Sequence, residues 1–542
     1  MTNHSNRPTK TVWALSALAS VAGLSACGGG SDDPLPAPVQ PAAVACADLA
    51  TYKVASVNTI IASAEPVNAS ASAPFTSPNG GGGSATVTQP FCRVTGSVQP
   101  SASSDIRFEL WLPPAVTWNE KFAGTASGGS NGYISYGTVN LHLSMGYASV
   151  GHDNGHRASD ANFALNADRK IDFAYRAQHV VTQVGKELTQ AFYAAAPKHA
   201  YYNGCSQGGH HGIMEMNRYP GDYDGIIAGA PASDWTGTLA AEANAALAQW
   251  GTVGAGIPKT LQVEVRRKVI ETCDGKPGID PLLDGVLDDP RQCHFDPAVM
   301  QCGMPTADPS LCLSAPQVQA LRLALDGRRK STGESVALGY EPDAIGGIFF
   351  PTDLTSPANP QGSWSNHWRY AVFENPAYDF TTFNWDKDVD FARGKEGPTY
   401  DTVTGDFSAF ADRGGKFLMY HGWADSLITP ALTLDTWSRM RAQMGTAKVT
   451  SFARLYMVPG MDHCGGGTGT SNFQLLTALS NWVEKGIPPD GTSPADTTIA
   501  SRAANAGAGV VARTRPLCPY PEAARYIGSG DINDAANFIC AN

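Results

Sequence analysis

The sequence predicts an α/β fold, with a mostly parallel sheet covered by helices and a large lid inserted between its two parts. Strand-like and helix-like patterns alternate from about residue 100 to 230 and again from about 415 to 490. Between these stretches the chain carries clustered cysteines, many prolines and glycines, and aromatic residues without a clear period. We therefore expect a core in two parts, residues 45–234 and 406–542, and a lid over residues 235–405.

Hydrophobic patterns place the main elements of this core. Residues 106–112 alternate between apolar and less apolar side chains, which predicts a half-buried strand. Residues 147–151 and 417–421 predict further strands. Between Val180 and Phe192 apolar side chains recur every four residues, which predicts a long amphipathic helix.

The N-terminus has the pattern of a signal peptide. Arg7 and Lys10 precede the apolar run Val12–Leu24, which is too short to cross a membrane comfortably as a helix. The run ends in small residues that lead into Cys27, an arrangement that resembles the lipobox of bacterial lipoproteins. We therefore expect residues 1–27 to be a signal peptide with a lipobox, in which Cys27 is acylated.

The segment after Cys27 supports a tether. Residues 28–44 are rich in glycine and proline and have little to bury, so we expect a flexible linker. The mature protein would then be an outer-membrane or cell-surface lipoprotein. The alternative is ordinary cleavage near Ala26, which leaves a free thiol on a secreted protein.

Composition limits the partners of the mature chain. The 542 residues are 42% apolar and 16% charged, enough for a large core and for more than one usual domain. The formal net charge of −11 and the absence of a basic run argue against nucleic acid or an anionic membrane surface. No second apolar run has the length of a membrane-spanning helix, so we expect membrane contact only through the lipid anchor.

The cysteine count agrees with export. Of the 11 cysteines, removing Cys27 leaves an even number, as a disulfide framework in an oxidising compartment requires. The sequence alone does not fix the pairing, but short local loops favour Cys273 with Cys293, Cys302 with Cys312, and Cys518 with Cys540. The remaining cysteines are Cys46, Cys92, Cys205 and Cys464. No Cys-x-x-Cys pair supports a zinc ribbon or a redox site.

The most informative stretch surrounds Ser206. A β-prone run from His199 meets Gly-Cys-Ser-Gln-Gly at residues 204–208, and a helical pattern follows through Arg218. Glycines two residues either side of the serine allow the sharp strand-to-helix turn of an α/β-hydrolase nucleophile elbow. Ser206 is therefore the predicted nucleophile rather than an ordinary turn serine, and the amide of Gln207 is a predicted oxyanion donor.

A catalytic serine needs a base and an acid, which in this fold follow it in the order acid, then histidine. A predicted strand that begins at Lys416 runs into a loop, and Asp425 lies in that loop just past the sheet edge, the position expected for the acid. His463 lies in the loop after the next predicted strand. The alternatives are a loop-capping aspartate and a surface-loop histidine. Asp462 is a weaker rival for the acid, because sequence neighbours rarely face each other across a loop.

Cysteines flank both of these predicted catalytic residues, Cys205 before Ser206 and Cys464 after His463. This arrangement resembles the tannase and feruloyl esterase family, whose hallmark is a disulfide between the neighbours of the catalytic serine and histidine. The resemblance covers nearly all of the mature chain. It includes the motifs at residues 204–209, 420–425, 458–464 and 515–521.

The resemblance also implies two features that the residues alone leave open. One is a second oxyanion donor in the glycine-rich loop 127–132, where Gly129 is favoured and Gly128 is the rival. The other is a structural calcium ion in the lid. Its implied ligands are the side chains of Asp274, Asp280 and Asp284 and the backbone oxygens of Leu282 and Val286. Oxygen-rich, acidic surroundings suit calcium, although acidic turns are usually only solvated, and the insertion from Lys276 makes Asp274 the least secure ligand.

The implied reaction is hydrolysis of an aromatic acid ester through an acyl-enzyme, without an organic cofactor. Feruloyl or galloyl esters are favoured, because we find no confident counterpart of the arginine with which a terephthalate mono-ester hydrolase of this fold binds its substrate. Arg369 is the nearest basic candidate. Lid aromatics that can stack on a ring, or form the lid's own core, are Phe349, Phe350, Trp364, Trp368, Tyr370, Phe373 and Trp385. The alternatives are the terephthalate mono-ester hydrolase, a non-catalytic surface-binding lipoprotein, and a metal-dependent hydrolase.

Overall fold

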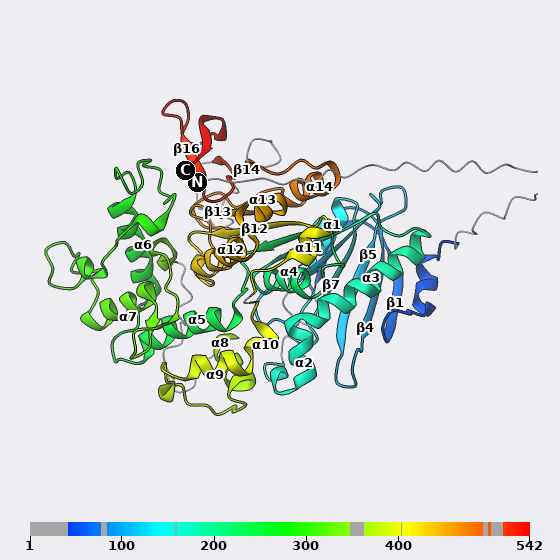
Figure 1. Cartoon of the computed structure of the whole chain (residues 1–542), viewed down its shortest axis with the longest axis horizontal. Helices are drawn as coiled ribbons and strands as arrows, with labels where there is room; N and C mark the ends of the chain where they lie inside the picture. Colours follow the sequence, from blue (N-terminus) through cyan, green and yellow to red (C-terminus); the bar gives the residue numbers. More distant parts are fainter. Residues whose placement is uncertain are drawn as a thin grey trace, which may run out of the picture. The chain divides into compact units, whose positions relative to one another are not determined.

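A nine-stranded sheet forms the centre of the computed structural model, which describes residues 42–76, 84–157, 160–346, 363–402, 404–490, 497–499 and 513–542. The strand order is β1-β4-β5-β7-β6-β8-β9-β12-β13 (Figure 1). The strands are β1 (Thr59–Val67), β4 (Phe91–Val98), β5 (Ile106–Leu112), β6 (Lys121–Ala126), β7 (Ala148–His152), β8 (His199–Cys205), β9 (Gly225–Gly229), β12 (Lys416–Gly422) and β13 (Ala453–Val458).

The sheet is antiparallel at one end and parallel through the rest. Strands β1, β4, β5 and β7 pair antiparallel, whereas the pairs from β7 and β6 through to β12 and β13 are all parallel. The parallel strands are buried and apolar, as expected where helices cover both faces. Their carboxyl ends meet at one edge, which is where α/β folds bind ligands. The α/β-hydrolase fold is therefore confirmed.

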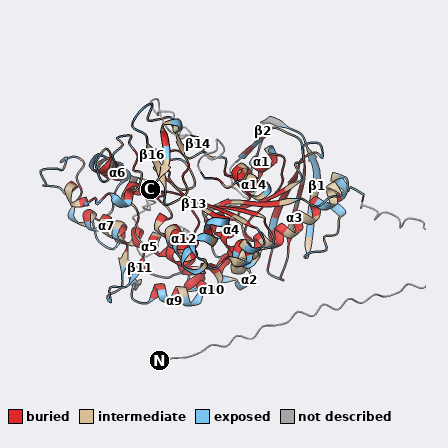
Figure 2. Cartoon of the chain, turned by 45° about the horizontal axis from the view of Figure 1, so that its top comes forward, coloured by how far each residue is buried: buried red, intermediate tan, exposed pale blue. Residues whose placement is uncertain are grey.

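Helices cover the two faces of the sheet. The large core cluster joins α3, α4, α12 and α13 to one face, and two smaller clusters join α1 and α14 to the other. Figure 2 shows the central strands as mostly buried. The helices are α1 (Tyr136–Ser144), α2 (Ala167–Ile171), α3 (Ala177–Tyr193), α4 (Gln207–Arg218), α11 (Ser408–Asp412), α12 (Pro430–Met444), α13 (Thr446–Phe452) and α14 (Leu475–Lys485).

Strand β5 differs from its prediction. We expected residues 106–112 to be half-buried, but only Arg107 is exposed. The reason is Glu109, which turns away from the main core yet accepts hydrogen bonds from Arg93, Trp111 and Tyr136 at 2.5–3.0 Å. A fully hydrogen-bonded carboxylate can be buried at modest cost, so this second face is covered as well.

Buried residues of the lid segment pack in two clusters within the unit of residues 42–542, and one of these clusters also contains core residues such as Phe173 and Leu432. Its helices are α5 (Trp235–Trp250), α6 (Lys259–Cys273), α7 (Ala315–Asp326), α8 (Ser363–Asn366), α9 (Asp388–Lys395) and α10 (Gly397–Tyr400), with the short strands β10 (Arg328–Arg329) and β11 (Ser335–Ala337). Helix α5 begins at an N-cap, where the Asp234 carboxylate accepts from the Gly237 amide at 2.8 Å. Helix α5 also contacts α7, α8, α9 and α10, so it organises the lid.

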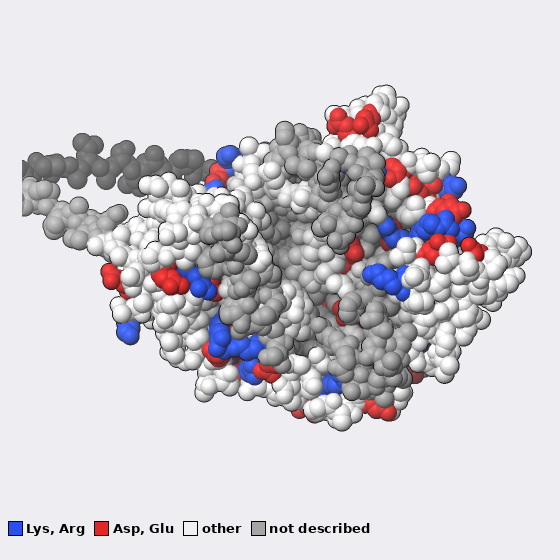
Figure 3. All heavy atoms as spheres, turned by 180° about the vertical axis from the view of Figure 1, so that it is seen from behind, with Lys and Arg blue, Asp and Glu red and all other residues white. Residues whose placement is uncertain are grey.

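Short antiparallel pairs complete the chain. They are β2 (Ser70–Thr76) with β3 (Ser84–Val87), β14 (Thr497–Ile499) with β15 (Thr514–Pro516), and β16 (Ala523–Tyr526) with β17 (Phe538–Ala541). Figure 3 shows acidic and basic side chains mixed on one face of the molecule.

The predicted signal peptide 1–27, with Cys27, lies outside the described residues, as does most of the predicted linker 28–44. The described end of that linker contacts the core, because the Val44 amide donates to Ala191 O at 3.0 Å. Within the described part of the chain, no helix is both long and apolar enough to cross a bilayer.

Candidate active site

Ser206 stands at the turn between β8 and α4, at the carboxyl edge of the sheet. Its backbone has φ 64° and ψ −125°, a conformation that a residue with a side chain rarely adopts. The turn is possible because the chain approaches itself very closely at its glycines. A Cβ on Gly204 would lie 2.5 Å from Gly208 O, and one on Gly208 would lie 2.8 Å from Ala126 O. The two glycines predicted from the sequence are therefore sterically required.

Asp425 and His463 meet at the same edge, in the loops after β12 and β13. The Nδ1 of His463 lies 2.8 Å from Asp425 Oδ2, so it donates its proton to the carboxylate. The other carboxylate oxygen of Asp425 accepts from the amides of Leu427 and Ile428, each at 2.9 Å. This fixes the ring and leaves Nε2 of His463 as the acceptor nitrogen.

His421 is a further partner of the acid that the sequence reasoning did not identify. Its Nε2 lies 3.0 Å from Asp425 Oδ2 and donates to Ile428 O at 2.9 Å, while its Nδ1 accepts from Thr433 Oγ1 at 2.7 Å. Both His421 and Asp425 are fully buried. His421 therefore holds the carboxylate and its loop in place.

The electrostatics of this pair oppose the effect of burial. Burial raises the pKa of Asp425, but the nearby charge of His463 and the hydrogen bonds from His421 and His463 outweigh it and hold that pKa well below its usual range. Burial likewise lowers the pKa of His463, but the Asp425 carboxylate outweighs it, so the net pKa is raised. A carboxylate that stays ionised beside a histidine stabilises the imidazolium form.

Asp462, the rival acid, has a different task in the structure. Its Oδ1 accepts from the Ser426 hydroxyl at 2.8 Å and from the His463 amide at 2.8 Å. The carboxylate therefore links the loop after β13 to the loop that carries Asp425. The carboxylate that contacts the His463 ring is that of Asp425.

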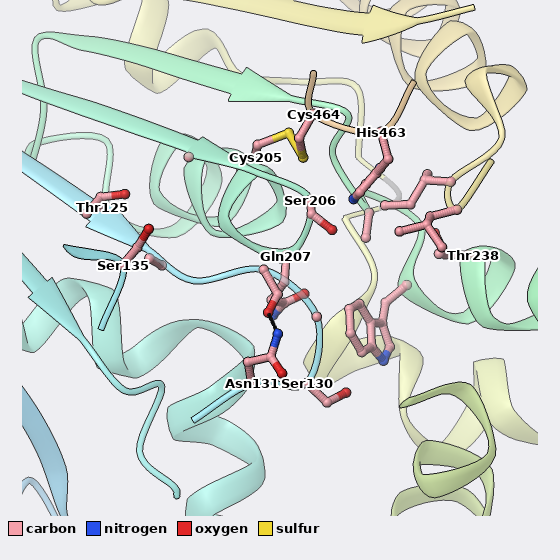
Figure 4. Close-up of a pocket in the computed structure, with 18 of the residues that line it drawn as sticks. Thr125, Ser130, Asn131, Ser135, Cys205, Ser206, Gln207, Thr238, His463 and Cys464 are labelled. Atoms are coloured by element: carbon pink, nitrogen blue, oxygen red, sulfur yellow. Dashed lines mark hydrogen bonds between the residues drawn. A yellow bond between two sulfur atoms is a disulfide. The ribbon is translucent and has the colours of Figure 1, made fainter. Parts of the chain in front are cut away.

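A disulfide between Cys205 and Cys464 joins the nucleophile elbow to the histidine loop, across 259 positions of sequence. In Figure 4 the Ser206 hydroxyl and the His463 ring point toward each other beside this bridge. The structure also forms the three local pairs expected from short loops and joins the two cysteines that remained. These bridges are Cys273–Cys293, Cys302–Cys312, Cys518–Cys540 and Cys46–Cys92. Five disulfides are consistent with an exported protein.

The glycine-rich loop lies directly against Ser206. A Cβ on Gly128 would stand 3.3 Å from Ser206 Cβ, and Gly129 follows it with φ 62°. Gln207 is the first residue of α4, so its amide lies at the positive end of the helix dipole. Gly128, Gly129 and Gln207 thus line one cavity with the serine.

Two residues after β7 fix this glycine-rich loop, and sequence reasoning missed both as supports. Asn154 Nδ2 donates to Ser127 Oγ at 2.9 Å and to Asn131 O at 3.0 Å. His156 Nε2 donates to Ser130 O at 3.0 Å. Backbone amides beside Ser206 are therefore held by buried side chains rather than by a free loop.

The chain was compared with known proteins. The family model for tannase and feruloyl esterase matches residues 92–541. The chain belongs to this family. Members of the tannase and feruloyl esterase family hydrolyse carboxylic esters, so the protein is a carboxylic-ester hydrolase, and the assignment supports an aromatic acid ester as substrate.

Relatives within the tannase and feruloyl esterase family match most of the chain. An uncharacterised esterase of Xanthomonas campestris is 36% identical and covers 92% of both chains. The mono(2-hydroxyethyl) terephthalate hydrolase of Piscinibacter sakaiensis is 33% identical, over 83% of this chain and 84% of its own. The crystal structure of feruloyl esterase B from Aspergillus oryzae aligns with a TM-score of 0.80 at 27% identity, over 91% of this chain and 98% of that one.

The cavity of this tannase-family protein has a volume of about 700 Å³ and two walls. The sheet-edge wall includes Ser206, Gln207, His463 and residues 128–131 of the glycine-rich loop. The lid wall consists of Trp235, Thr238, Leu239 and Glu242 of α5 together with Trp364 of α8. Two indole rings and a leucine make the lid wall mostly apolar, as a site for an aromatic group would be.

The lid aromatics named from the sequence take several places. Trp364 and Trp368 both belong to a cluster that joins the lid to core residues such as Phe173, but of the two only Trp364 lines the cavity. Phe373 packs against that cluster, and Arg369 lies over the Phe380 ring, 5.1 Å from its centroid. Tyr370 and Trp385 pack against the same cluster, and Phe349 and Phe350 lie outside the described residues. Trp235, which the sequence reasoning did not name, lines the cavity because α5 starts at the cavity rim. Its signal was the Asp234 N-cap before an apolar helix.

The acidic loop of the lid crowds several carboxylates. The Asp274 carboxylate accepts from the Gly285 amide at 2.7 Å, and the Asp280 carboxylate accepts from the Asp288 amide at 2.8 Å. Burial, with added like charge from neighbouring carboxylates, raises the pKa of Asp280 to about 6 and that of Asp288 to about 7. Asp284 pairs with Arg515 and lies 3.5 Å from Arg513 Nη1. Disulfide Cys273–Cys293 closes the loop.

Proposed function

We propose that the protein is a serine esterase that hydrolyses feruloyl or galloyl esters through an acyl-enzyme. The observation that carries the proposal is the 2.8 Å contact of His463 Nδ1 with the buried Asp425 carboxylate, on a ring that faces Ser206. A serine, a histidine and an aspartate in this relation activate the serine as a nucleophile.

The proposed reaction begins with proton transfer from Ser206 Oγ to Nε2 of His463. The serine oxygen attacks the ester carbonyl carbon, and Asp425 stabilises the imidazolium that forms. His463 then gives the proton to the alcohol, which leaves, and the acyl group remains on Ser206. A water molecule, deprotonated by His463, attacks the acyl-enzyme and releases the acid.

The developing oxyanion would rest on backbone amides. The amide of Gln207 lies at the helix terminus, and the second donor comes from the glycine-rich loop, with Gly129 favoured and Gly128 close beside Ser206. The hydrogen bonds from Asn154 and His156 support this assignment, because donors that are fixed in advance stabilise a transition state without reorganisation.

The lid wall supports an aromatic acyl group. Trp235 and Trp364 line the cavity that contains Ser206, and indole rings can stack on an aromatic group. The runner-up substrate is mono(2-hydroxyethyl) terephthalate, which the Piscinibacter sakaiensis relative is named for hydrolysing. Arg369, our nearest candidate for its carboxylate, is buried against Phe380 and is not among the cavity-lining residues that the structure describes.

The test is hydrolysis of methyl ferulate, methyl gallate and mono(2-hydroxyethyl) terephthalate by the mature protein and by Ser206→Ala. We expect turnover of methyl ferulate or methyl gallate, with a loss of about 10⁴-fold or more in the variant. Preference for the terephthalate ester would select the runner-up. Turnover that survives in the variant would contradict the serine mechanism, and no turnover at all would favour a binding lipoprotein.

We also propose that calcium binds the acidic loop of the lid. Asp274, Asp280 and Asp284 would supply carboxylates, and Leu282 and Val286 backbone oxygens, the hard donors that calcium prefers. Crowded carboxylates whose protons are held more tightly than usual fit a cation that relieves their repulsion. When bound, calcium would crosslink the loop and contribute no chemistry to ester hydrolysis.

Removal of calcium is therefore expected to lower the melting temperature by a few degrees without removing the serine activity. Calorimetry with EGTA and then with added calcium measures this. Asp280→Asn should abolish the calcium-dependent rise, whereas Asp308→Asn, an exposed lid aspartate, should keep it. If the melting temperature of the unaltered protein did not change with calcium, the proposed calcium site would be wrong.

We further propose that Cys27 is acylated after removal of residues 1–26, which would place the esterase on a membrane surface through the linker. The pattern of residues around Cys27 supports this. Mass spectrometry of the mature N-terminus is the test, with Cys27→Ser as the comparison. A free thiol or an uncleaved N-terminus would exclude the anchor.

A further inference from the structure

The lid wall contributes one ionisable carboxyl group to the described lining of the pocket. Among the described residues that line the cavity, none is a lysine or arginine, and Glu242 is the only carboxylate. The lid segment 347–362, which the structure does not describe, contains no lysine or arginine in its sequence either. A substrate that carries a carboxylate would therefore meet no cationic partner from any of these residues.

Glu242 lies on α5, two turns after Trp235 and one turn after Thr238, on the side of the helix that faces Ser206. The groups that influence its titration are His463, Asp425 and the buried Tyr340 phenol. Burial, and to a smaller extent the charge of Asp425, raises the pKa of Glu242 to about 8, although His463 acts in the opposite direction. Glu242 is thus a half-buried carboxyl close to the reacting histidine.

We propose that Glu242, in its ionised form, is a specificity-determining residue that admits neutral, hydroxyl-bearing esters and rejects esters whose acid part carries a second, free carboxylate. The proposal rests on the esterase function above. A carboxylate brought into this cavity would lose its hydration without an ion pair to a lysine or arginine among the described lining residues, and an ionised Glu242 would add repulsion at short range. A hydroxyl group can instead donate a hydrogen bond to Glu242, which suits phenolic acids.

The same arrangement separates the two candidate substrates. Ferulate and gallate esters are uncharged and carry phenolic hydroxyls, whereas mono(2-hydroxyethyl) terephthalate carries a carboxylate at the far end of its ring. Shape alone does not distinguish two para-substituted rings in a cavity of about 700 Å³. Charge does, so we assign the preference between these esters to Glu242 when its carboxyl group is ionised.

The test compares two esters of equal shape: mono(2-hydroxyethyl) terephthalate and its uncharged carbamoyl analogue, 2-hydroxyethyl 4-carbamoylbenzoate. At pH 9, where Glu242 is ionised, we expect the unaltered protein to have a kcat/KM about 100-fold lower for the acid than for the amide. Glu242→Gln should narrow this ratio by about tenfold, and the remainder is the cost of dehydrating the substrate carboxylate beside described lining residues that include no lysine or arginine. At pH 6, where Glu242 is protonated, the protein and the variant should give similar ratios.

Two further variants keep the outcome clear. Glu242→Met, uncharged and of similar size, should narrow the ratio as the glutamine does, and Glu271→Gln, an exposed lid glutamate on α6, should leave it unchanged. An equal ratio at pH 9 in the unaltered protein and in both Glu242 variants would overturn the proposal. If neither ester nor methyl ferulate were hydrolysed at all, the proposed function would fail instead.

Discussion

The sheet-edge wall and the lid wall of the cavity are held in place by different kinds of contact. On the sheet edge, each reactive group follows a buried parallel strand, and covalent and hydrogen bonds fix it: a disulfide beside Ser206 and His463, and four contacts on the Asp425 carboxylate. The lid wall comes from α5 and α8, which belong to an aromatic cluster distinct from the main sheet core, although this cluster also contains Phe173 and Leu432 of the core segments. The comparison teaches that the reaction and the choice of substrate are built on separate supports, so they are separable by mutation.

The largest expected effect is on the sheet edge. Asp425→Asn removes the charge that stabilises the imidazolium and favours the wrong tautomer of His463, so kcat for a feruloyl ester should fall about 10⁴-fold. Asp462→Asn is the matched control, because its carboxylate contacts Ser426 and the His463 amide and not the ring. A similar loss in both variants would mean that the loops, rather than the charge on the ring, carry the effect.

Removing one disulfide at the sheet edge and, separately, one in the lid segment compares the two regions directly. Replacing Cys205 and Cys464 by alanine should lower kcat about 10²-fold, because a displacement of about 1 Å between nucleophile and base is costly. Loop-closure entropy predicts a loss of unfolding free energy about 3 kcal/mol larger than that for replacing Cys302 and Cys312, since the closed loops span 259 and 10 positions. Kinetics and urea denaturation of both double variants measure this. Equal kcat values in the two double variants would show that the Cys205–Cys464 bridge does not position the nucleophile relative to the base.

On the lid wall we expect a smaller effect that depends on the substrate. Trp364→Phe removes part of a ring from the cavity and should raise KM for methyl ferulate about tenfold, with little change for p-nitrophenyl acetate. Trp368→Phe, in the same aromatic cluster but not among the described residues that line the cavity, is the comparison. If both variants change both substrates alike, the lid acts through stability alone.

The smallest effect is a shift in pH dependence. His463 must be neutral to accept the proton of Ser206, so kcat/KM for an uncharged ester should fall as the pH drops through its pKa. Because Asp425 raises that pKa, the midpoint should lie above about 6.5, the ordinary value for histidine. In Asp425→Asn the residual activity should have its midpoint at lower pH, since burial then acts without the opposing charge. A midpoint that does not move would exclude His463 as the titrating base.

Sequence patterns were most informative where the chemistry is local. Gly204, Ser206 and Gly208 lie within one short stretch of the chain, and Gly204 approaches Gly208 O within the same turn, whereas the contact that requires Gly208 is with Ala126 O of β6. The predicted strands at 147–151 and 417–421 agree with β7 and β12 to within a residue. A short apolar run that is bounded by turn residues is usually a strand, so few alternative structures compete with this prediction.

Residues that act from a distance had no such pattern. Asn154 and His156 support the glycine-rich loop through contacts 23 and 26 positions away, and Glu242 reaches the cavity only because α5 packs across the sheet edge. Burial of β5 on both faces also escaped prediction, since Glu109 is polar and is satisfied by partners from β4 and α1. Periodicity reports which face of an element is apolar, not which distant polar groups will satisfy one another.

The Cys205–Cys464 bridge makes a closed covalent ring of the 259 positions between its ends, and the whole lid lies within that ring. A protease that cuts the chain once inside the lid would therefore not release either half. The two pieces would stay joined, with Ser206 on one and Asp425 and His463 on the other, and would separate on a gel only after reduction. A single cut in the lid therefore does not by itself separate Ser206 from Asp425 and His463 in this protein.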